Sequence, residues 1–393
     1  MRTALVTWDY PPSPSGLSTA AREIAESLKL AGADVTVFSM GRDDEAAIGG
    51  IRVVGCRIAD EAGLGRLRLW GGVGHLAAPL AFRDAVLAEH MRRPFAVVEA
   101  TNWYAPAVFL AGRPGLALVT RNSTPCAFSR DPPSSARDRF DGWMSDKLER
   151  RQARHSAGLI SNTADHARRI AVEYGLEQGA QPHAVIGLSL PPEMIERGKA
   201  AAYPALEAGQ AARLLFVGRA EHRKGFDALM EAAAILAREA EAGGPDFALR
   251  LAGVSDDALA GDLPEAARRR IEALGRVDES DLAAEYAGAH AVLAPSRYES
   301  FGLVYQEGMA YGRPMVASNE DASAREFVGQ AGAGAMAETT SGPALADAIR
   351  AVLTNADYRR SLREKALLAT GRFTRRTLGT ETLALYEKAL ARV

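Results

Sequence analysis

The chain has 393 residues, of which 47% are hydrophobic and 24% charged, and its formal net charge at pH 7 is −2. This length allows two domains, each with its own core, and the composition is that of an ordinary globular protein. The nearly neutral charge balance gives no reason to expect nucleic acid or a strongly anionic surface as a partner.

The first half alternates strand-like and helix-like stretches, which predicts an α/β domain with a parallel sheet. A loop of Pro, Ser and Gly follows the first apolar run, and a helix is expected over about 19–31. The apolar runs that we expect to form buried strands are 4–7, 34–39, 96–98, 116–120 and 158–161. The stretch at 137–154 holds six basic and four acidic residues, which favours a solvated helix face over a membrane-contact patch.

The second half begins after a region rich in Pro, Ala and Gly at about 187–210, which indicates a linker. Its apolar runs, again expected as strands, are 214–217, 248–252, 275–277, 291–294 and 315–318. We therefore predict two facing Rossmann-like domains with parallel sheets and an interdomain cleft. The expected domains are 1–187 and 188–376, and a terminal helix at about 377–393 is expected to pack back on the first.

The chain shows no sign of secretion or membrane insertion. Its first strand starts at the N-terminus, without the apolar core of a signal peptide. No apolar run approaches the ~20 residues that a transmembrane helix needs, which leaves at most peripheral membrane contact. The two cysteines, Cys56 and Cys126, lack metal-type spacing. We expect buried thiols in a cytoplasmic protein.

The stretch at 295–317 carries the strongest functional signal. A buried apolar run leads into it, and the chain turns at Gly302 into a predicted helix. A strand that feeds a helix N-terminus presents unpaired backbone N–H groups, which can seat a phosphate. Glu299 and Glu307 lie at the two ends of this turn, and ionised carboxylates accept hydrogen bonds from sugar hydroxyls. The segment therefore predicts a ligand that carries both phosphate and sugar.

A second motif follows the run at 214–217. Gly218 allows close backbone approach to a ligand, and Arg219 and Lys224 supply positive charge that suits a diphosphate. The residue order of a P-loop is absent. Taken alone, this motif is explained equally well as a solvated loop with surface cations.

Together the two motifs resemble the retaining glycosyltransferases of family 4, a GT-B group that uses nucleotide-sugar donors. The pattern of that family has a Gly-Arg pair, a following Lys-Gly pair and a later E-x7-E element. The matching residues here are Gly218 and Arg219, Lys224 and Gly225, and Glu299 and Glu307. The resemblance covers nearly the whole chain and is stronger in its C-terminal half.

The resemblance implies a role for each matching residue. Arg219 and Lys224 would hold the donor diphosphate, and Glu299 would face the donor sugar, so that these three form the catalytic set. Glu307 would accept hydrogen bonds from the ribose hydroxyls. The other implied donor-binding residues are Gly16, Gly218, Arg276, Val277, Phe301, Gly302, Leu303 and Val304. The implied reaction is a front-face transfer in which the leaving phosphate takes the acceptor proton, without a metal or an enzymic nucleophile.

The chain departs from the family pattern at two places. It has Gly308 where the family commonly has Ala, and a helical Gly costs about 0.8–1.0 kcal/mol relative to Ala, so close packing or ligand approach is expected there. Asn122 or Ser123 stands where many members carry a His, and we expect Asn122 to bond a sugar hydroxyl. Asn102 and Trp103 are expected to help bind the acceptor in the first domain, although a packed strand end explains them equally well.

Other classes fit the sequence less well. The seven His residues show no metal-ligand spacing, and neither a D-x-D element nor a G-x-G-x-x-G turn for a nicotinamide cofactor occurs. A glycoside hydrolase with Glu299 and Glu307 as its carboxylate pair would leave Arg219 and Lys224 without a role. A GT-B epimerase, a phosphorylase and a nucleotide-sugar-binding protein without turnover stay open. We expect a nucleoside-diphosphate sugar as co-substrate, with no metal or other cofactor.

Overall fold

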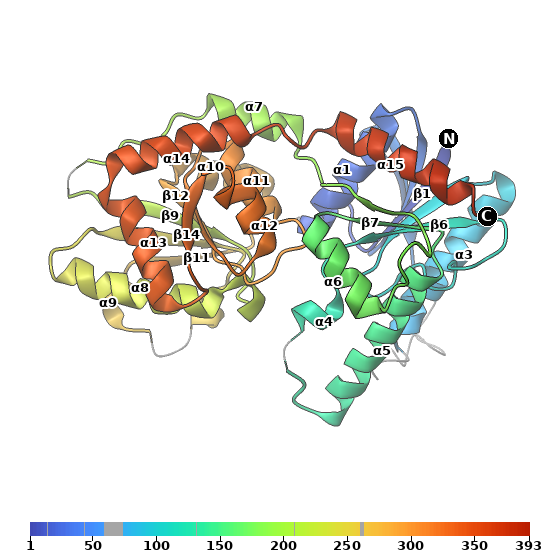
Figure 1. The fold of residues 1–393 in the computed structure, drawn as a ribbon, viewed down its shortest axis with the longest axis horizontal. Helices are drawn as coiled ribbons and strands as arrows, with labels where there is room; N and C mark the ends of the chain where they lie inside the picture. The colour runs from blue at the N-terminus through green and yellow to red at the C-terminus, as the bar shows by residue number, and fades with distance from the viewer. Residues whose placement is uncertain (14, 43, 59–73, 131, 208, 260–262) are drawn as a thin grey trace. The chain divides into compact units, whose positions relative to one another are not determined.

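The computed structural model describes residues 1–393 except 14, 43, 59–73, 131, 208 and 260–262. The described chain forms two compact units (Figure 1). The first consists of Met1–Ser189 and Phe373–Val393, and the second of Leu190–Arg372. Each is a Rossmann-like α/β unit built on a mainly parallel sheet, which confirms the predicted fold class.

The first unit contains an eight-stranded sheet of order β3-β4-β2-β1-β5-β6-β7-β8. Its strands are β1 Arg2–Thr7, β2 Asp34–Met40, β3 Glu45–Ile48, β4 Ile51–Cys56, β5 Val97–Thr101, β6 Ala117–Asn122, β7 Gly158–Ser161 and β8 His183–Val185. All neighbouring strands pair in parallel except β3 and β4. The strand order reverses between β1 and β5, because β2 lies on one side of this pair and β6 on the other. The connections that follow β1 and β5 therefore run in opposite directions along the sheet.

The helices of the first unit include the last helix of the chain. They are α1 Gly16–Leu30, α3 Ala77–Arg92, α4 Cys126–Ser129, α5 Ala136–Arg154, α6 Ala164–Tyr174 and α15 Arg375–Leu390. α15 packs closely on α1, because a Cβ at Gly379 would lie 2.1 Å from the carbonyl oxygen of Ser27. The guanidinium of Arg375 also donates two hydrogen bonds, of 2.8 and 2.6 Å, to the buried carboxylate of Glu23. These contacts make the end of the chain part of the first unit.

The second unit contains a six-stranded sheet of order β11-β10-β9-β12-β13-β14, in which every pairing is parallel. Its strands are β9 Ala212–Val217, β10 Phe247–Ala252, β11 Ile271–Gly275, β12 Ala291–Ala294, β13 Met315–Ser318 and β14 Gly334–Ala337. Its helices are α7 Pro192–Ala200, the 3-10 turn η2 His222–Lys224, α8 Phe226–Glu241, the 3-10 turn η3 Asp256–Leu259, α9 Glu265–Arg268, α10 Glu279–Gly288, α11 Leu303–Ala310, α12 Ala322–Ala324, the π-helical turn η4 Arg325–Gly329, α13 Gly342–Thr354 and α14 Ala356–Ala369.

Two predictions for this half were wrong. The strand expected at 275–277 is Ile271–Gly275, and Gly275 ends it because its φ of +61° departs from extended backbone. The linker expected at 187–210 contains α7, which starts with Pro192 in its first turn. α7 packs on α11, since a Cβ at Gly198 would lie 2.4 Å from the carbonyl oxygen of Ala310.

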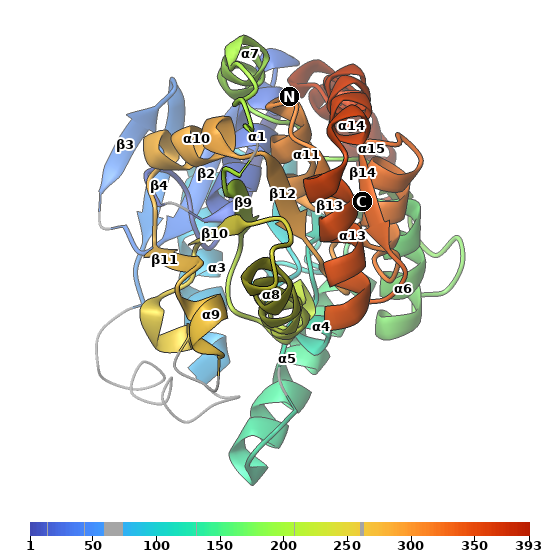
Figure 2. The same cartoon turned by 90° about the vertical axis from the view of Figure 1, so that its left-hand side faces the viewer.

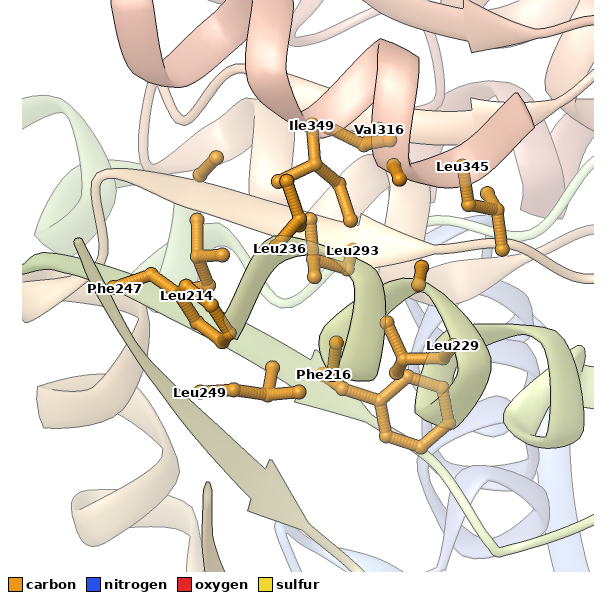
Figure 3. Packing of buried hydrophobic residues seen from close by; sticks show 14 of the residues in the cluster. Leu214, Phe216, Leu229, Leu236, Phe247, Leu249, Leu293, Val316, Leu345 and Ile349 are labelled. Atoms are coloured by element: carbon orange, nitrogen blue, oxygen red, sulfur yellow. The ribbon is translucent and has the colours of Figure 1, made fainter. Parts of the chain in front are cut away.

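The core of the second unit fixes the strands whose ends carry the two motifs. α8 and α13 lie side by side (Figure 2) and pack against the sheet. Figure 3 shows apolar side chains of the sheet meeting Leu229 and Leu236 of α8 and Leu345 and Ile349 of α13. In β9 and β12, Phe216 lies opposite Leu293, so the two strands end next to each other. Among the described residues, no helix combines the length and apolar character needed to cross a membrane.

Candidate functional site

The two sequence motifs meet at the carboxyl edge of the second sheet. Strand order reverses between β9 and β12, and open α/β sheets bind ligands at such a reversal, outside the carboxyl ends of the strands. The loop after β9 contains Gly218 and leads to Lys224, and the loop after β12 contains Glu299. Residues about 75 positions apart in sequence are thereby brought together.

A glycine allows these two loops to touch. Gly225 has a φ of +70°, and a Cβ there would lie 2.1 Å from the carbonyl oxygen of Pro295. Arg297 adds a main-chain link, because its N–H donates to the carbonyl oxygen of Arg223 at 2.8 Å. The Arg297 guanidinium also bonds the Asp227 carboxylate at 2.7 and 2.9 Å. The loop after β9 is therefore held directly against the loop after β12.

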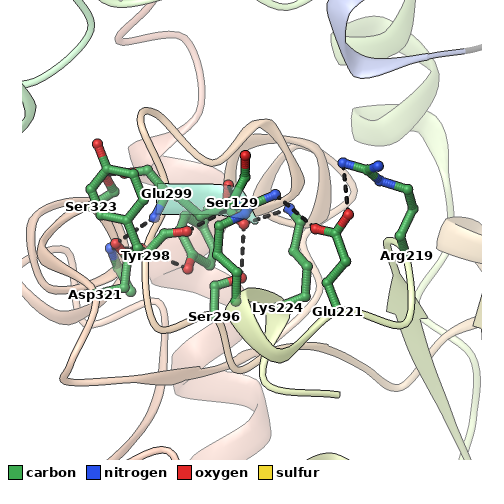
Figure 4. Close-up of polar contacts among 12 residues, drawn as sticks. Ser129, Arg219, Glu221, Lys224, Ser296, Tyr298, Glu299, Asp321 and Ser323 are labelled. Carbon is green, nitrogen blue, oxygen red and sulfur yellow. Dashed lines mark hydrogen bonds and ion pairs between the residues drawn. The ribbon is translucent and has the colours of Figure 1, made fainter. Parts of the chain in front are cut away.

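The carboxylate of Glu299 is the centre of the site (Figure 4). It accepts hydrogen bonds from Lys224 Nζ at 2.5 Å, Ser296 Oγ at 2.8 Å and Arg223 Nη1 at 3.1 Å, and its side chain is only 8% exposed. Burial alone would raise its pKa, but the charges of Lys224 and Arg223 and these hydrogen bonds lower the pKa to about 2. Glu299 is therefore ionised at any physiological pH.

Arg223, which was not among the predicted site residues, lies beside Glu299 together with Lys224. The Arg223 side chain is 11% exposed and bonds both Glu299 and Glu221. Arg219 is 70% exposed and pairs with Glu221 at 2.8 Å, away from Glu299 (Figure 4). Position next to Lys224 was the one signal in the sequence that could have pointed to Arg223.

The helix that follows Glu299 carries the other predicted donor-binding groups. Gly302, with a φ of +79°, precedes the first residue of α11, so the amides of Leu303 and Val304 lie in its first turn. Phe301 is buried and packs edge-on against Phe327 at 5.1 Å between ring centroids. Phe301 can therefore offer a ligand its backbone but not its ring.

Glu307 and Gly308 lie one turn further along α11. Glu307 accepts a 2.6 Å hydrogen bond from the hydroxyl of the buried Tyr286, and burial raises its pKa despite this bond. A Cβ at Gly308 would lie 2.5 Å from Sδ of Met315, so close packing of α11 on the sheet explains this glycine. Arg276 directly follows β11 at the same carboxyl edge and is exposed, and Val277 comes next.

The first unit has a corresponding edge at the reversal between β1 and β5. Trp8, after β1, donates from Nε1 to the carbonyl oxygen of Trp103, after β5, at 2.7 Å. Ser15 caps α1 by accepting from the amide of Ser18, so Gly16 is the first residue of that helix. A Cβ at Gly16 would meet no described atom within 4 Å. Local packing therefore does not explain this glycine.

The two asparagines named by the sequence are fully buried beneath this edge. Asn102 donates to the hydroxyl of Tyr174 at 2.7 Å and accepts from the amide of Ser123 at 2.6 Å. A packed strand end thus accounts for Asn102, while Trp103 is half-buried. Asn122 donates to Ser161 Oγ at 3.1 Å, and its Oδ1 has no hydrogen-bond partner among the described residues.

A buried carboxylate supports the loop after β5. Tyr104 and Ala105 adopt positive φ values of 52° and 45°, which non-glycine residues rarely do. Glu149 of α5 accepts from the amide of Tyr104 at 3.0 Å and from the hydroxyl of Tyr174 at 2.8 Å. Within the described part of the chain, no group of three or more His, Cys, Asp or Glu residues is arranged to hold a metal ion.

Both halves of the chain match known protein families. The model described as "Glycosyl transferases group 1" matches residues 204–368, and the "Glycosyl transferase 4-like domain" matches residues 15–187. A glycogen synthase of Mycobacterium tuberculosis is 28% identical over 414 aligned positions, which cover 98% of this chain and 94% of that protein.

Solved structures share the whole fold. Sucrose-phosphate synthase from Thermosynechococcus elongatus matches with a TM-score of 0.75 at 20% identity, over 100% of both chains. The Anabaena protein HepE, solved with UDP and glucose, matches with a TM-score of 0.65 at 19% identity, over 98% of this chain and 99% of that one. At this level of identity, the structural likeness establishes the fold.

Proposed function

We propose that this chain, a glycosyltransferase of the GT-B fold, moves a sugar from a nucleoside-diphosphate sugar to an acceptor hydroxyl with retention of configuration. The reaction we propose is a front-face transfer that needs no metal. The observation that carries the proposal is the convergence of Lys224 and Arg223 on Glu299 where strand order reverses. We also propose a cytoplasmic location, with no nucleic-acid partner.

The charge arrangement supports diphosphate departure. Negative charge develops on the leaving phosphate, and fixed donors near that charge lower the barrier; loss of one such donor typically costs ~2.7–4 kcal/mol. We assign this role to Lys224, to the exposed Arg219 and to the first amides of α11, with Gly218 at close backbone approach. Arg223 and Lys224 are already fixed at this edge by their ion pairs with Glu299, and they supply positive charge without a metal.

Glu299 fits a sugar-binding role better than an acid or base role. A pKa of about 2 leaves it without a proton to donate at neutral pH. In a glycoside hydrolase Glu299 would have to attack the sugar or activate water, but its carboxylate is already held by Lys224, Arg223 and Ser296. Glu307 is bonded to Tyr286, which suits a fixed acceptor for ribose hydroxyls. We propose Arg276 and Val277 as neighbours of the base.

We assign acceptor binding to the first unit. Trp103 is half-buried, and its carbonyl oxygen is bonded to Trp8, so the loops after β1 and β5 are joined there. We propose that Oδ1 of Asn122, which is buried and has no hydrogen-bond partner among the described residues, accepts from a sugar hydroxyl, while its amide nitrogen donates to Ser161. Ser123 supports these loops by donating from its amide and its hydroxyl to Oδ1 of Asn102.

The first experiment identifies the donor and then tests the cations. Thermal shift with UDP, GDP, ADP and TDP finds the nucleotide, because binding to the native state raises its stability. Release of that nucleotide from its sugar conjugate then measures turnover. Arg219→Ala and Lys224→Ala should each lose turnover while remaining folded, whereas Arg238→Ala, an exposed arginine of α8, should not. Normal rates in both test variants would refute the assignment.

Product analysis tests the finer parts of the proposal. The anomeric configuration of the product by NMR should match that of the donor sugar, and an inverted product would overturn retention. Turnover should persist in excess EDTA. An epimerase would release nucleotide without acceptor, a phosphorylase would require inorganic phosphate, and a binding protein would bind donor without turnover.

A further inference from the structure

The main chain of Glu299 is held as firmly as its carboxylate. Its amide donates to Asp321 Oδ1 at 2.9 Å, and its carbonyl oxygen accepts from Ser323 Oγ at 2.9 Å. Asp321 and Ser323 come from one short segment after β13 and are each 1% exposed. Both polar main-chain groups of Glu299 therefore depend on a single neighbouring segment, which is visible in Figure 4.

The second carboxylate oxygen of Asp321 binds two further groups. Oδ2 accepts from the hydroxyl of Tyr305 at 2.8 Å and from the amide of Ala324 at 3.0 Å. Tyr305 belongs to α11 and is fully buried. One buried carboxylate thus joins the loop of Glu299, the helix that follows it and the first turn of α12.

We propose that Asp321 is a positioning residue, which sets the place of Glu299 through the main chain. This inference rests on the proposed contact between Glu299 and the donor sugar. The side chain of Glu299 must reach Lys224 and a bound sugar at the same time. A shift of about 1 Å in such a group can lower the rate about 100-fold without removing any catalytic atom.

The side chain of Asp321 accepts hydrogen bonds from three donors and donates none. A carboxylate accepts at both oxygens, whereas the amide nitrogen of Asn donates only. In Asp321→Asn, the remaining side-chain oxygen can still accept from the amide of Glu299. The new side-chain nitrogen then faces the backbone amide of Ala324, and both of these groups are donors. Asp321→Asn should therefore keep part of the function, and Asp321→Ala should lose it.

The test separates positioning from a loss of folding. We would measure kcat/KM for transfer, together with the Kd of the nucleoside diphosphate and of the full nucleotide-sugar. Asp321→Ala should lower kcat/KM by about 100-fold. Its affinity for the nucleoside diphosphate should be kept, and the additional affinity that the sugar gives to the nucleotide-sugar should be lost. Asp321→Asn should lie between the wild type and Asp321→Ala. Asn355→Ala, which removes a helix cap of α14 in the same unit, is the matched control and should transfer normally.

Three results bear on the inference. Loss of the sugar-dependent part of binding in Asp321→Ala, with partial recovery in Asp321→Asn, would support it. Equal weakening of nucleoside diphosphate and nucleotide-sugar binding, together with a lower Tm, would show a structural role only and overturn it. Normal transfer by Asp321→Ala beside an active wild type would overturn it and leave the proposed function standing, whereas an inactive wild type contradicts the proposed function itself.

Discussion

We expect the wild type to lose stability as pH rises because Glu149 ionises, and we expect Glu149→Gln not to show this loss. Glu149 is completely buried, and burial raises its pKa to about 7 from an ordinary 4.5, although hydrogen bonds from Cys126, Tyr174 and Tyr104 lower it. A raised carboxyl pKa means that the folded protein holds the proton longer than the unfolded chain. The stability from this proton is complete below pH 4.5 and is lost as pH rises through 7.

The size of the effect follows from the two pKa values of Glu149. At about 1.4 kcal/mol per pKa unit, ionisation at pH 8 costs the folded state about 3 kcal/mol relative to low pH. Urea unfolding at pH 5 and pH 8 should therefore show a fall in the free energy of unfolding that is about 2–3 kcal/mol larger in the wild type than in Glu149→Gln. Glu387→Gln, an exposed glutamate of α15, should follow the wild type. Equal pH slopes in wild type and Glu149→Gln would refute the reasoning.

Two further predictions concern the second unit. Glu299→Gln should lower the free energy of unfolding at pH 7 by about 3–5 kcal/mol, because Lys224 and Arg223, whose side chains are largely removed from water, lose the ionised carboxylate between them. Since the pKa of Glu299 is lowered to about 2, its stabilising effect is lost as pH falls from 4.5 through 2, and a gap to the wild type that is unchanged at pH 2 would contradict this. Gly225→Ala should lose transfer activity and at least about 1–2 kcal/mol of stability, because its left-handed backbone disfavours a Cβ that would also displace Pro295. Gly243→Ala has a similar φ of +90° in open space and controls for the backbone cost, so normal transfer by Gly225→Ala would refute the close contact of the loops.

Local sequence pattern was enough for the elements that are buried on both faces. The runs at 158–161, 291–294 and 315–318 coincide with β7, β12 and β13, because a strand covered by helices on both sides is apolar throughout. The glycine-and-charge motifs also point to the correct edge of the second sheet, since loops after parallel strands collect there. The reversal of strand order that makes this edge a site is a property of the topology, which no local pattern records.

Only the tertiary structure decided which charged groups meet. Arg223 and not Arg219 lies against Glu299, because the η2 turn and the left-handed Gly225 set the direction of the loop. Asp321 reaches Glu299 across 22 positions of sequence, through packing of the loops after β12 and β13. The sequence by itself determined the fold class and the chemistry available at the site, because hydrophobic periodicity and residue type are local. The geometry of the site depends on contacts between distant segments, and those contacts exist only in the folded chain.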